Sequence, residues 1–195
     1  MPTTFRSRNT HTGQRFQCQL QCTRCTARTA AGVRCRRRVC IGTTTCFQHR
    51  RRDLGVRVAP SPGRGKGLFS TRRLPRDTNI LRYDGELLTP AQVSARYGNN
   101  AQNGHAPYAL SVTQRGANVG RVQDLGCRRG IGGLINGSAT RGQANVTASA
   151  NANRDGSINI RTLDRAIPPN TELLMWYGPL YNQSAQFNEH STRSR

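Results

Sequence analysis

The chain has 195 residues, of which 34% are hydrophobic, and its formal net charge is +21 at pH 7. This length suits one ordinary domain, or one domain with a small additional module. The sequence contains neither an apolar run of membrane-spanning length nor a signal-peptide core near Met1, so we expect a soluble intracellular protein rather than a membrane or secreted one.

The positive charge is concentrated toward the N-terminus. Residues 1–52 carry 12 Arg and no acidic residue, whereas residues 53–195 carry 18 basic and 9 acidic residues. Lys66 is the single lysine, a bias for which a GC-rich coding sequence is a sufficient cause. Guanidinium groups still pair bidentately with phosphate, so we expect nucleic acid or another anionic surface to attract the protein.

Six of the seven Cys lie close together, between Cys18 and Cys46. Because the sequence has no secretory signal, metal binding is favoured over disulfides. Cys22-x2-Cys25 and Cys46-x2-His49 have the spacing of zinc-knuckle pairs. A segment with so few large apolar side chains needs such a metal ion to fold, so we predict a zinc module here.

The choice of zinc ligands follows from a resemblance. CTARTAAGVRC, followed later by CFQH, resembles a small Cys-Cys-Cys-His module of many viral and phage proteins. That resemblance implies four ligands of one zinc ion: Cys25, Cys35, Cys46 and His49. Three other cysteines are then either spare or form a second zinc site with help from His11: Cys18, Cys22 and Cys40. We expect the remaining Cys127 to be structural.

Two Arg runs accompany the zinc module. The first run lies inside the module and the second follows it directly: Arg36, Arg37 and Arg38, and then Arg50, Arg51 and Arg52. No acidic residue offsets either run, so we predict that both contact the phosphates of a nucleic acid. A solvated charged surface is the alternative.

The sequence from Leu54 onward is typical of short strands joined by tight turns. SPGRGKGLFS predicts a glycine-rich turn, and PAQVSARYG predicts a short helix with Pro90 at its favourable first position. Seven stretches predict strands: LGVRVAP, NILRYDGELL, PYALSV, VGRVQDL, GIGGLINGS, SINIRTLD and ELLMWYG. Frequent glycines and the lack of long helical periodicity therefore predict a mainly β fold.

Four stretches of this second part occur in a recognisable order: SPGRGKGLFSTRRLPRDTNILRYDGELLT, YALSV with VQDLG, GGLINGSATRGQANV, and INIRTLDRAIPPNTELLMWYG. Together they resemble a SET domain, the protein lysine methyltransferase fold, over residues 54–181. TELLMWYG looks like the closing strand of PRDM-type SET domains, and the combination of a zinc module with a SET domain in so short a chain is similar to viral members.

The resemblance implies a mainly β architecture: a SET-type β-clip of several small sheets with a pseudoknot-like C-terminus, preceded by a small zinc-stapled module. The expected divisions are a basic flexible N-terminus (1–17), the Cys/His zinc module (18–52), the SET-like domain (53–181) and a polar tail (182–195).

The resemblance also implies a binding site for S-adenosylmethionine. In the family this cofactor lies against the backbone of the glycine turn, which here is Gly65, Lys66 and Gly67. The Asn of the family's Asn-His-Ser motif corresponds to Asn136, and Gly137 stands where the His is expected. A backbone contact to the cofactor survives this change, whereas packing under the cofactor is altered.

The resemblance implies that the catalytic residues are tyrosines. Tyr177 closes the last strand, where the family's tyrosine lines the lysine channel beside the cofactor, and Tyr83 and Tyr108 are further candidates for channel tyrosines. The family's Pro-Asn after the Asn-His-Ser motif is displaced, with Asn145 as its nearest remnant, and no Cys follows Cys127 to form the family's C-terminal zinc cluster.

We therefore expect a zinc-containing, S-adenosylmethionine-dependent protein lysine methyltransferase that acts on histones in the nucleus. A lysine-rich tail and a protein of charge +21 repel each other, so we expect the substrate to be presented on a nucleosome or another nucleic-acid complex, with Asp84, Glu86 and Asp124 near the tail. The alternatives are a catalytically weak or inactive SET-like domain that binds chromatin through its zinc module, and a zinc-dependent structural protein without a cofactor.

Overall fold

The structure is a computed structural model that describes residues 2–8, 15–40, 45–98, 109–111, 120–126 and 131–178. For the residues before Cys22, and for Cys40 and Phe47, the description covers the backbone alone. The fold is mainly β and consists of several small sheets, as the sequence predicts. No helix within these ranges is long and apolar enough to cross a membrane.

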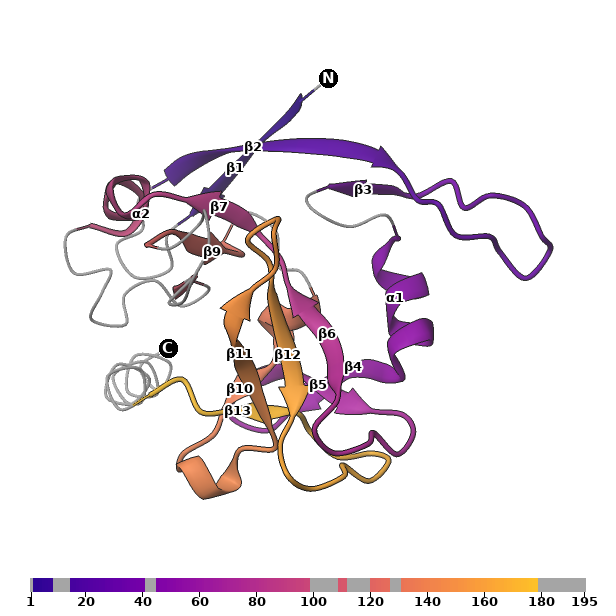
Figure 1. Cartoon of the computed structure of the whole chain (residues 1–195). Helices are drawn as coiled ribbons and strands as arrows, with labels where there is room; N and C mark the ends of the chain where they lie inside the picture. The colour runs from indigo at the N-terminus through magenta and orange to yellow at the C-terminus, as the bar shows by residue number, and fades with distance from the viewer. Residues whose placement is uncertain are drawn as a thin grey trace.

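The N-terminal part forms an antiparallel sheet. Strand β1 (Pro2–Arg8) pairs with β2 (Arg15–Arg24), which pairs with β3 (Arg38–Cys40) (Figure 1). The segment 1–17, expected to be flexible, therefore contributes two strand segments. The expectation was based on its charge, whereas the interspersed Thr and Phe residues of PTTFRSR favour an extended backbone.

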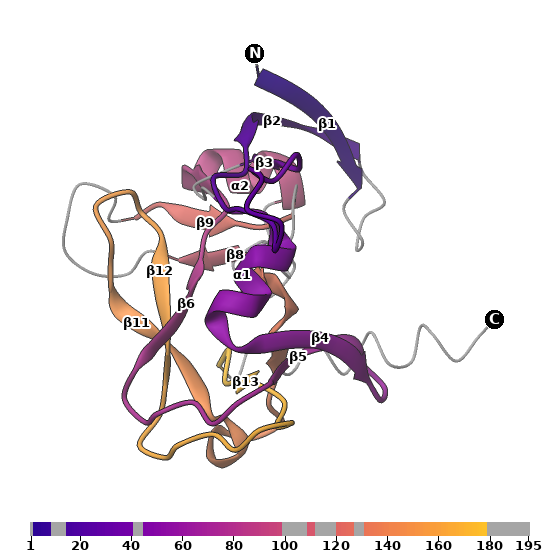
Figure 2. The ribbon, with the colours of Figure 1, turned by 90° about the vertical axis from the view of Figure 1, so that its right-hand side faces the viewer.

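Helix α1 (Phe47–Leu54) contains the last residues of the zinc module, His49 among them, and was not predicted. It begins after Cys46 and ends at Gly55, whose left-handed φ of 69° suits a glycine and whose N–H donates to the Arg51 carbonyl oxygen. Figure 2 shows α1 between the N-terminal sheet and the strand that follows it. The helix thereby joins the zinc module to the larger β domain.

The β domain begins with a hairpin of β4 (Val56–Ser61) and β5 (Gly65–Ser70). A second sheet has the order β7 (Glu86–Leu88), β9 (Val122–Asp124), β8 (Ala109–Ser111). Helix α2 (Pro90–Tyr97) begins where the sequence predicts, with Thr89 and Gln92 forming a capping box. Two short 3-10 turns complete the domain, η2 (Ile131–Leu134) and η3 (Arg141–Gln143).

The largest sheet has the order β10 (Asn136–Gly137), β13 (Leu174–Met175), β11 (Val146–Ala152), β12 (Ile158–Thr162), β6 (Asn79–Tyr83). The late strand β13 is inserted between β10 and β11 and runs parallel to both. The Ser138 N–H donates to the Met175 carbonyl oxygen at 3.0 Å. This insertion brings the closing stretch of the domain beside Asn136.

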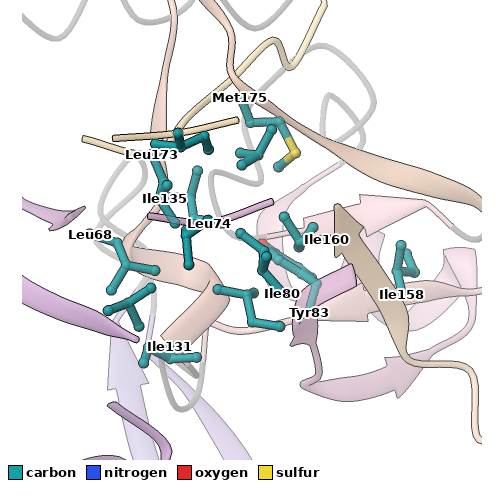
Figure 3. Close-up of a cluster of buried hydrophobic side chains, with 14 of the residues drawn as sticks. Leu68, Leu74, Ile80, Tyr83, Ile131, Ile135, Ile158, Ile160, Leu173 and Met175 are labelled. Atoms are coloured by element: carbon teal, nitrogen blue, oxygen red, sulfur yellow. The ribbon is translucent and has the colours of Figure 1, made fainter. Parts of the chain in front are cut away.

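A hydrophobic core fills the space between these elements (Figure 3). Leu68, Val146, Ile160 and Leu173 are fully buried, and each comes from a different part of the β domain. Complete burial of such a side chain contributes about 1.5–3 kcal/mol to the free energy of unfolding. The core therefore fixes the relative positions of the hairpin, of η2 and of the largest sheet.

Candidate metal centre and cofactor site

Four side chains of the zinc module converge as predicted. The sulfur atoms of Cys25, Cys35 and Cys46 and a ring nitrogen of His49 all lie within 4.8 Å of one another, and the three cysteines are buried. Two distances involve Nδ1 of His49, which lies 3.6 Å from the Cys25 sulfur and 3.3 Å from the Cys46 sulfur. The Cys35 and Cys46 sulfurs are 3.9 Å apart.

This geometry fits zinc. Tetrahedral Zn–S and Zn–N bonds place their ligand atoms about 3.5–3.8 Å apart, close to the distances seen here. Burial opposes ionisation of the Cys25 thiol, but hydrogen bonds from the Cys46 and Ala27 backbone and from His49 lower its pKa to about 7. The pKa of the neighbouring Cys35 thiol is instead raised, so the fit to zinc rests on the ligand set and its distances.

The second predicted zinc site is not seen among the described side chains. Cys22 is in a disulfide, and a disulfide sulfur offers no thiolate to a metal ion. Its backbone lies directly opposite Cys40 in the β2–β3 pair. The side chains of Cys18 and Cys40, and the whole of His11 and Cys127, lie outside the described residues. The thiolate of Cys22 is therefore not part of a metal site in this state.

The two Arg runs differ in their surroundings. Arg36, Arg37 and Arg38 are all exposed, which suits contact with a phosphate backbone. Arg50 instead turns toward the β domain, where its NH2 lies 3.0 Å from Oδ2 of Asp84. Consecutive helical residues point about 100° apart, so the run 50–52 cannot present all its charges on one face. Arg50 thus already has an acidic partner within the protein, and the phosphate contacts of both runs stay a prediction.

The glycine turn (residues 63–67) is held against the rest of the domain by Arg64. Gly63 and Gly65 have φ values of 71° and 76°, which a residue with a Cβ rarely adopts. The Arg64 guanidinium donates to Oγ of Ser61 at 3.2 Å and to the Gly137 carbonyl oxygen at 3.3 Å. It also pairs with Oε2 of Glu172 at 2.9 Å.

Asn136 meets the glycine turn. Its Nδ2 donates to the Lys66 carbonyl oxygen at 3.3 Å and to Oε1 of Glu172 at 2.8 Å. Gly67 lies directly beneath this contact, because a Cβ at Gly67 would approach Oε1 of Glu172 to 2.4 Å and Nδ2 of Asn136 to 3.0 Å. Bare backbone is thus required at Gly67.

The phenol of Tyr177 contacts the same segment as Asn136. Its hydroxyl donates to the Ile135 carbonyl oxygen at 3.1 Å, and Ile135 immediately precedes Asn136. The predicted cofactor residues Lys66, Gly67, Asn136 and Tyr177 are therefore linked by direct contacts or by adjacent residues. A turn, a short strand and the end of the domain converge on one place.

The sequence matches the SET domain family over residues 65–178, which is more than half of the chain. The chain belongs to the SET domain family. SET domains are the fold of protein lysine methyltransferases that use S-adenosylmethionine, so this chemistry is the one to test on the site. A search of curated proteins finds no match.

Of the other two predicted channel tyrosines, only Tyr83 is among the described residues. Tyr83 belongs to the hydrophobic core and is 2% exposed, with its ring against Gly132 (Figure 3). Its role in a lysine channel stays a prediction. Tyr108 lies outside the described residues. Tyr177 is therefore the tyrosine whose described contact lies next to Asn136.

Asn145 has a structural position in the SET domain. Its Nδ2 donates to the Glu172 carbonyl oxygen at 2.7 Å, and its Oδ1 accepts from the Leu174 N–H at 2.9 Å. The amide thus satisfies backbone groups on both sides of Leu173. These bonds hold the stretch before β13, which carries Glu172, beside Asn145.

Arg64 and Glu172 were not among the predicted site residues. Each nevertheless has a distinctive position in the sequence: Arg64 stands between two glycines, and Glu172 is the single acid of TELLMWYG. No local sequence pattern predicts that these two residues pair, because 108 residues separate them. Only the insertion of β13 beside β10 brings them together.

Each acidic side chain of the described residues pairs with an Arg. The pairs are Asp53–Arg52, Asp77–Arg161, Asp84–Arg50, Glu86–Arg96, Asp124–Arg96, Asp155–Arg82, Asp164–Arg165 and Glu172–Arg64. These ion pairs leave Asp84, Glu86 and Asp124 little free charge for a basic tail, and their place near such a tail stays a prediction. Asp124 is fully buried, and Asp84 is 7% exposed.

Proposed function

We propose that this SET domain is an S-adenosylmethionine-dependent protein lysine N-methyltransferase that acts on histones associated with nucleic acid, in the nucleus. The observation that carries the proposal is the meeting of the glycine turn, Asn136 and the Tyr177 hydroxyl around the Ile135–Asn136 backbone. The PRDM-like and viral-type assignments belong to this proposal and rest on the closing stretch TELLMWYG and on the short chain with a zinc module.

The residues present fit the cofactor. The Lys66–Gly67 backbone and the Asn136 amide offer hydrogen-bonding groups beside a surface that a Cβ would fill. When bound, S-adenosylmethionine would supply a methyl group carried by a positively charged sulfur, and a neutral amine would take that methyl group in place of the sulfur. The total charge is unchanged in this displacement, so the site needs alignment and oxygen atoms rather than a catalytic carboxylate pair.

Tyr177 and Ile135 provide such oxygen atoms. The Tyr177 hydroxyl is fixed by its bond to the Ile135 carbonyl, and both oxygens carry partial negative charge next to Asn136. Fixed dipoles favour a positively charged group that passes them, and they require no reorganisation during the reaction. Alignment of two reactants in a narrow site contributes at most about 7–11 kcal/mol to the lowering of the barrier.

The lysine must arrive neutral, although the pKa of a free lysine is about 10.4. A partly buried aromatic wall disfavours the ammonium form by desolvation, and the nearby positive sulfur adds repulsion between like charges. Both effects lower the lysine pKa before the methyl group is transferred. Tyr177, half-buried at the edge of the core, is placed to contribute to that wall.

The nucleic-acid context is supported by the charge distribution. Because each described acid already pairs with an Arg, the protein has no unpaired carboxylate in these ranges to hold a basic tail. Nucleic acid supplies the missing negative charge, and the exposed Arg36, Arg37 and Arg38 are suited to contact its phosphates. The tail would then be delivered by its complex rather than by its own charge.

Labelled methyl transfer tests this proposal. Nucleosomes, free core histones and a free tail peptide are offered to the zinc-loaded protein and to Tyr177→Phe, at low and at raised salt. We expect transfer to lysine that is fastest on nucleosomes and that declines with salt. Equal rates on all three substrates, independent of salt, contradict the nucleic-acid context. Binding to nucleosomes without any transfer supports the alternative of an inactive SET-like domain.

A further inference from the structure

Glu172 connects two residues of the cofactor site through its two carboxylate oxygens. Oε1 accepts from Nδ2 of Asn136 at 2.8 Å, and Oε2 pairs with NH2 of Arg64 at 2.9 Å. The side chain is 13% exposed, so water contributes little to its solvation. Arg64 in turn is fixed by Ser61 and Gly137, which leaves the carboxylate a single well-defined position.

The surroundings of Asn136 determine the orientation of its amide. The two groups that face Nδ2 are the Lys66 carbonyl and the Glu172 carboxylate, and both can only accept hydrogen bonds. Rotation of the amide by 180° would place Oδ1 against two acceptors, one of them charged. The charge-assisted bond to Glu172 is the stronger of the two, so Glu172 contributes most to this preference.

The fixed nitrogen leaves Oδ1 of Asn136 turned away from both acceptors. Among the described residues, none donates a hydrogen bond to this oxygen. We propose that Glu172 is a positioning residue: its carboxylate, held by Arg64, orients the Asn136 amide so that Oδ1 accepts a hydrogen bond from the bound cofactor. This inference rests on the proposed function and adds to it two residues that do not contact the reacting atoms.

Calorimetric titration of the zinc-loaded protein with S-adenosylmethionine tests the role of Glu172. Glu172→Gln keeps the size of the side chain but gives Asn136 a partner that also donates, so the amide is no longer held in one orientation. We expect the Kd to rise about tenfold, the effect of losing one hydrogen bond to a well-placed group. Asp77→Asn is the control, because it also removes a carboxylate that pairs with an Arg, but one that lies at the surface.

A second ligand separates positioning from direct attraction. S-adenosylhomocysteine keeps the amino, ribose and adenine donors of the cofactor but lacks the positive charge on sulfur. If Glu172 acts through Asn136, Glu172→Gln weakens both ligands by the same factor. If the carboxylate attracts the positive sulfur directly, the loss is confined to S-adenosylmethionine, and the positioning role is overturned.

A double-mutant cycle shows whether Glu172 acts through Asn136. Asn136→Ala removes the oriented oxygen, so the further change of Glu172→Gln should have no additional effect on the Kd. Additive losses would contradict the proposal. Arg64→Gln, at a side chain 39% exposed, is a second variant in case Glu172→Gln unfolds the protein, and we expect a rise of about threefold because the carboxylate stays but is less well held.

The outcomes separate the two proposals. If the wild type binds both ligands and Glu172→Gln and Arg64→Gln bind them equally well, the positioning role is wrong while the proposed function stands. If the wild type binds neither ligand, the proposed function fails and this inference fails with it. Parallel losses for both ligands, absent in Asp77→Asn and non-additive with Asn136→Ala, support the inference.

Discussion

The Tyr177 hydroxyl donates a hydrogen bond of 3.1 Å to the carbonyl oxygen of Ile135, 42 residues earlier in the chain. This bond joins the end of the stretch that carries β13 to the residue before Asn136. It exists because β13 is inserted beside β10, where the Cα atoms of Asn136 and Leu174 are partners. The same insertion places Glu172 over Gly67. Strand order, rather than any single motif, thus assembles the site.

Tyr177→Phe should reduce turnover more than cofactor binding. In the proposed mechanism the phenol oxygen contributes to the fixed dipoles near the reacting atoms, and loss of one preorganised polar group at a reacting centre lowers kcat by about 10²-fold. We expect the Kd for S-adenosylmethionine to change by less than about threefold, since the Asn136 and Lys66 contacts remain. Steady-state kinetics and calorimetry measure the two quantities.

Tyr97→Phe is the control for this prediction. It also removes one hydroxyl, which donates to Oδ1 of Asp124 at 2.8 Å in a buried network away from Asn136. We expect it to lower the free energy of unfolding by about 1–3 kcal/mol and to leave kcat unchanged. Equal losses of kcat in both variants would show that the Tyr177 effect is one of general stability.

Gly67→Ala should impair the cofactor site through sterics. The backbone of Gly67 is not in the left-handed region, but an added Cβ would lie 2.4 Å from Oε1 of Glu172. The carboxylate must move, and the Asn136 amide with it, so we expect the Kd for S-adenosylmethionine to rise at least about tenfold. Gly142→Ala is the control, because nothing lies within 4 Å of a Cβ there. Unchanged binding in Gly67→Ala would contradict the position of Glu172.

Removal of zinc should unfold the N-terminal module. We expect one zinc ion per chain by elemental analysis of protein purified under reducing conditions, and a large loss of zinc in Cys35→Ser, because the cluster loses a buried ligand. Cys22→Ser should keep the full zinc content. Two zinc ions in the wild type, falling to one in Cys22→Ser, would instead support a second site.

The buried pair of Asp84 and Arg50 should give a pH dependence. Burial raises the Asp84 pKa from 3.8 to about 6, although Arg50 opposes this shift. The folded state therefore holds the proton more tightly than the unfolded state, and the resulting stability is present below pH 4 and is lost as the pH rises to about 6. A shift of this size corresponds to at most about 3 kcal/mol.

Asp84→Asn provides the comparison for this prediction. The two proteins share every other titratable group, so the difference between their free energies of unfolding isolates Asp84. Denaturant titrations from pH 4 to 7 should show the wild type losing stability relative to the variant as the pH rises. A gain with rising pH would mean that the ion pair with Arg50 outweighs desolvation.

Elements with strong local signals were predictable from the sequence. Strand β4, α2 with Pro90 at its start, and β12 lie where the pattern places them, whereas β5 lies in a stretch that was predicted only as a glycine-rich turn. The four residues of the candidate metal cluster were predictable because a resemblance supplied their spacing. In these cases a few neighbouring residues determine the structure.

The remaining elements depend on distant partners. Strand β11, with the sequence VTASANA, has weak β propensity and is a strand because β12 and β13 pair with its two edges. Helix α1 has no apolar periodicity, but Cys46 and His49 fix its beginning. GIGGLINGS was predicted as a strand and is mostly the turn η2, whose Gly132 packs on Tyr83.

The most direct test of the account is calorimetric titration of the intact, zinc-loaded wild-type protein with S-adenosylmethionine. The account predicts saturable binding of one ligand per chain that Asn136→Ala weakens and that Asp77→Asn leaves unchanged. Absence of saturable binding in a folded protein with its zinc ion in place would contradict it.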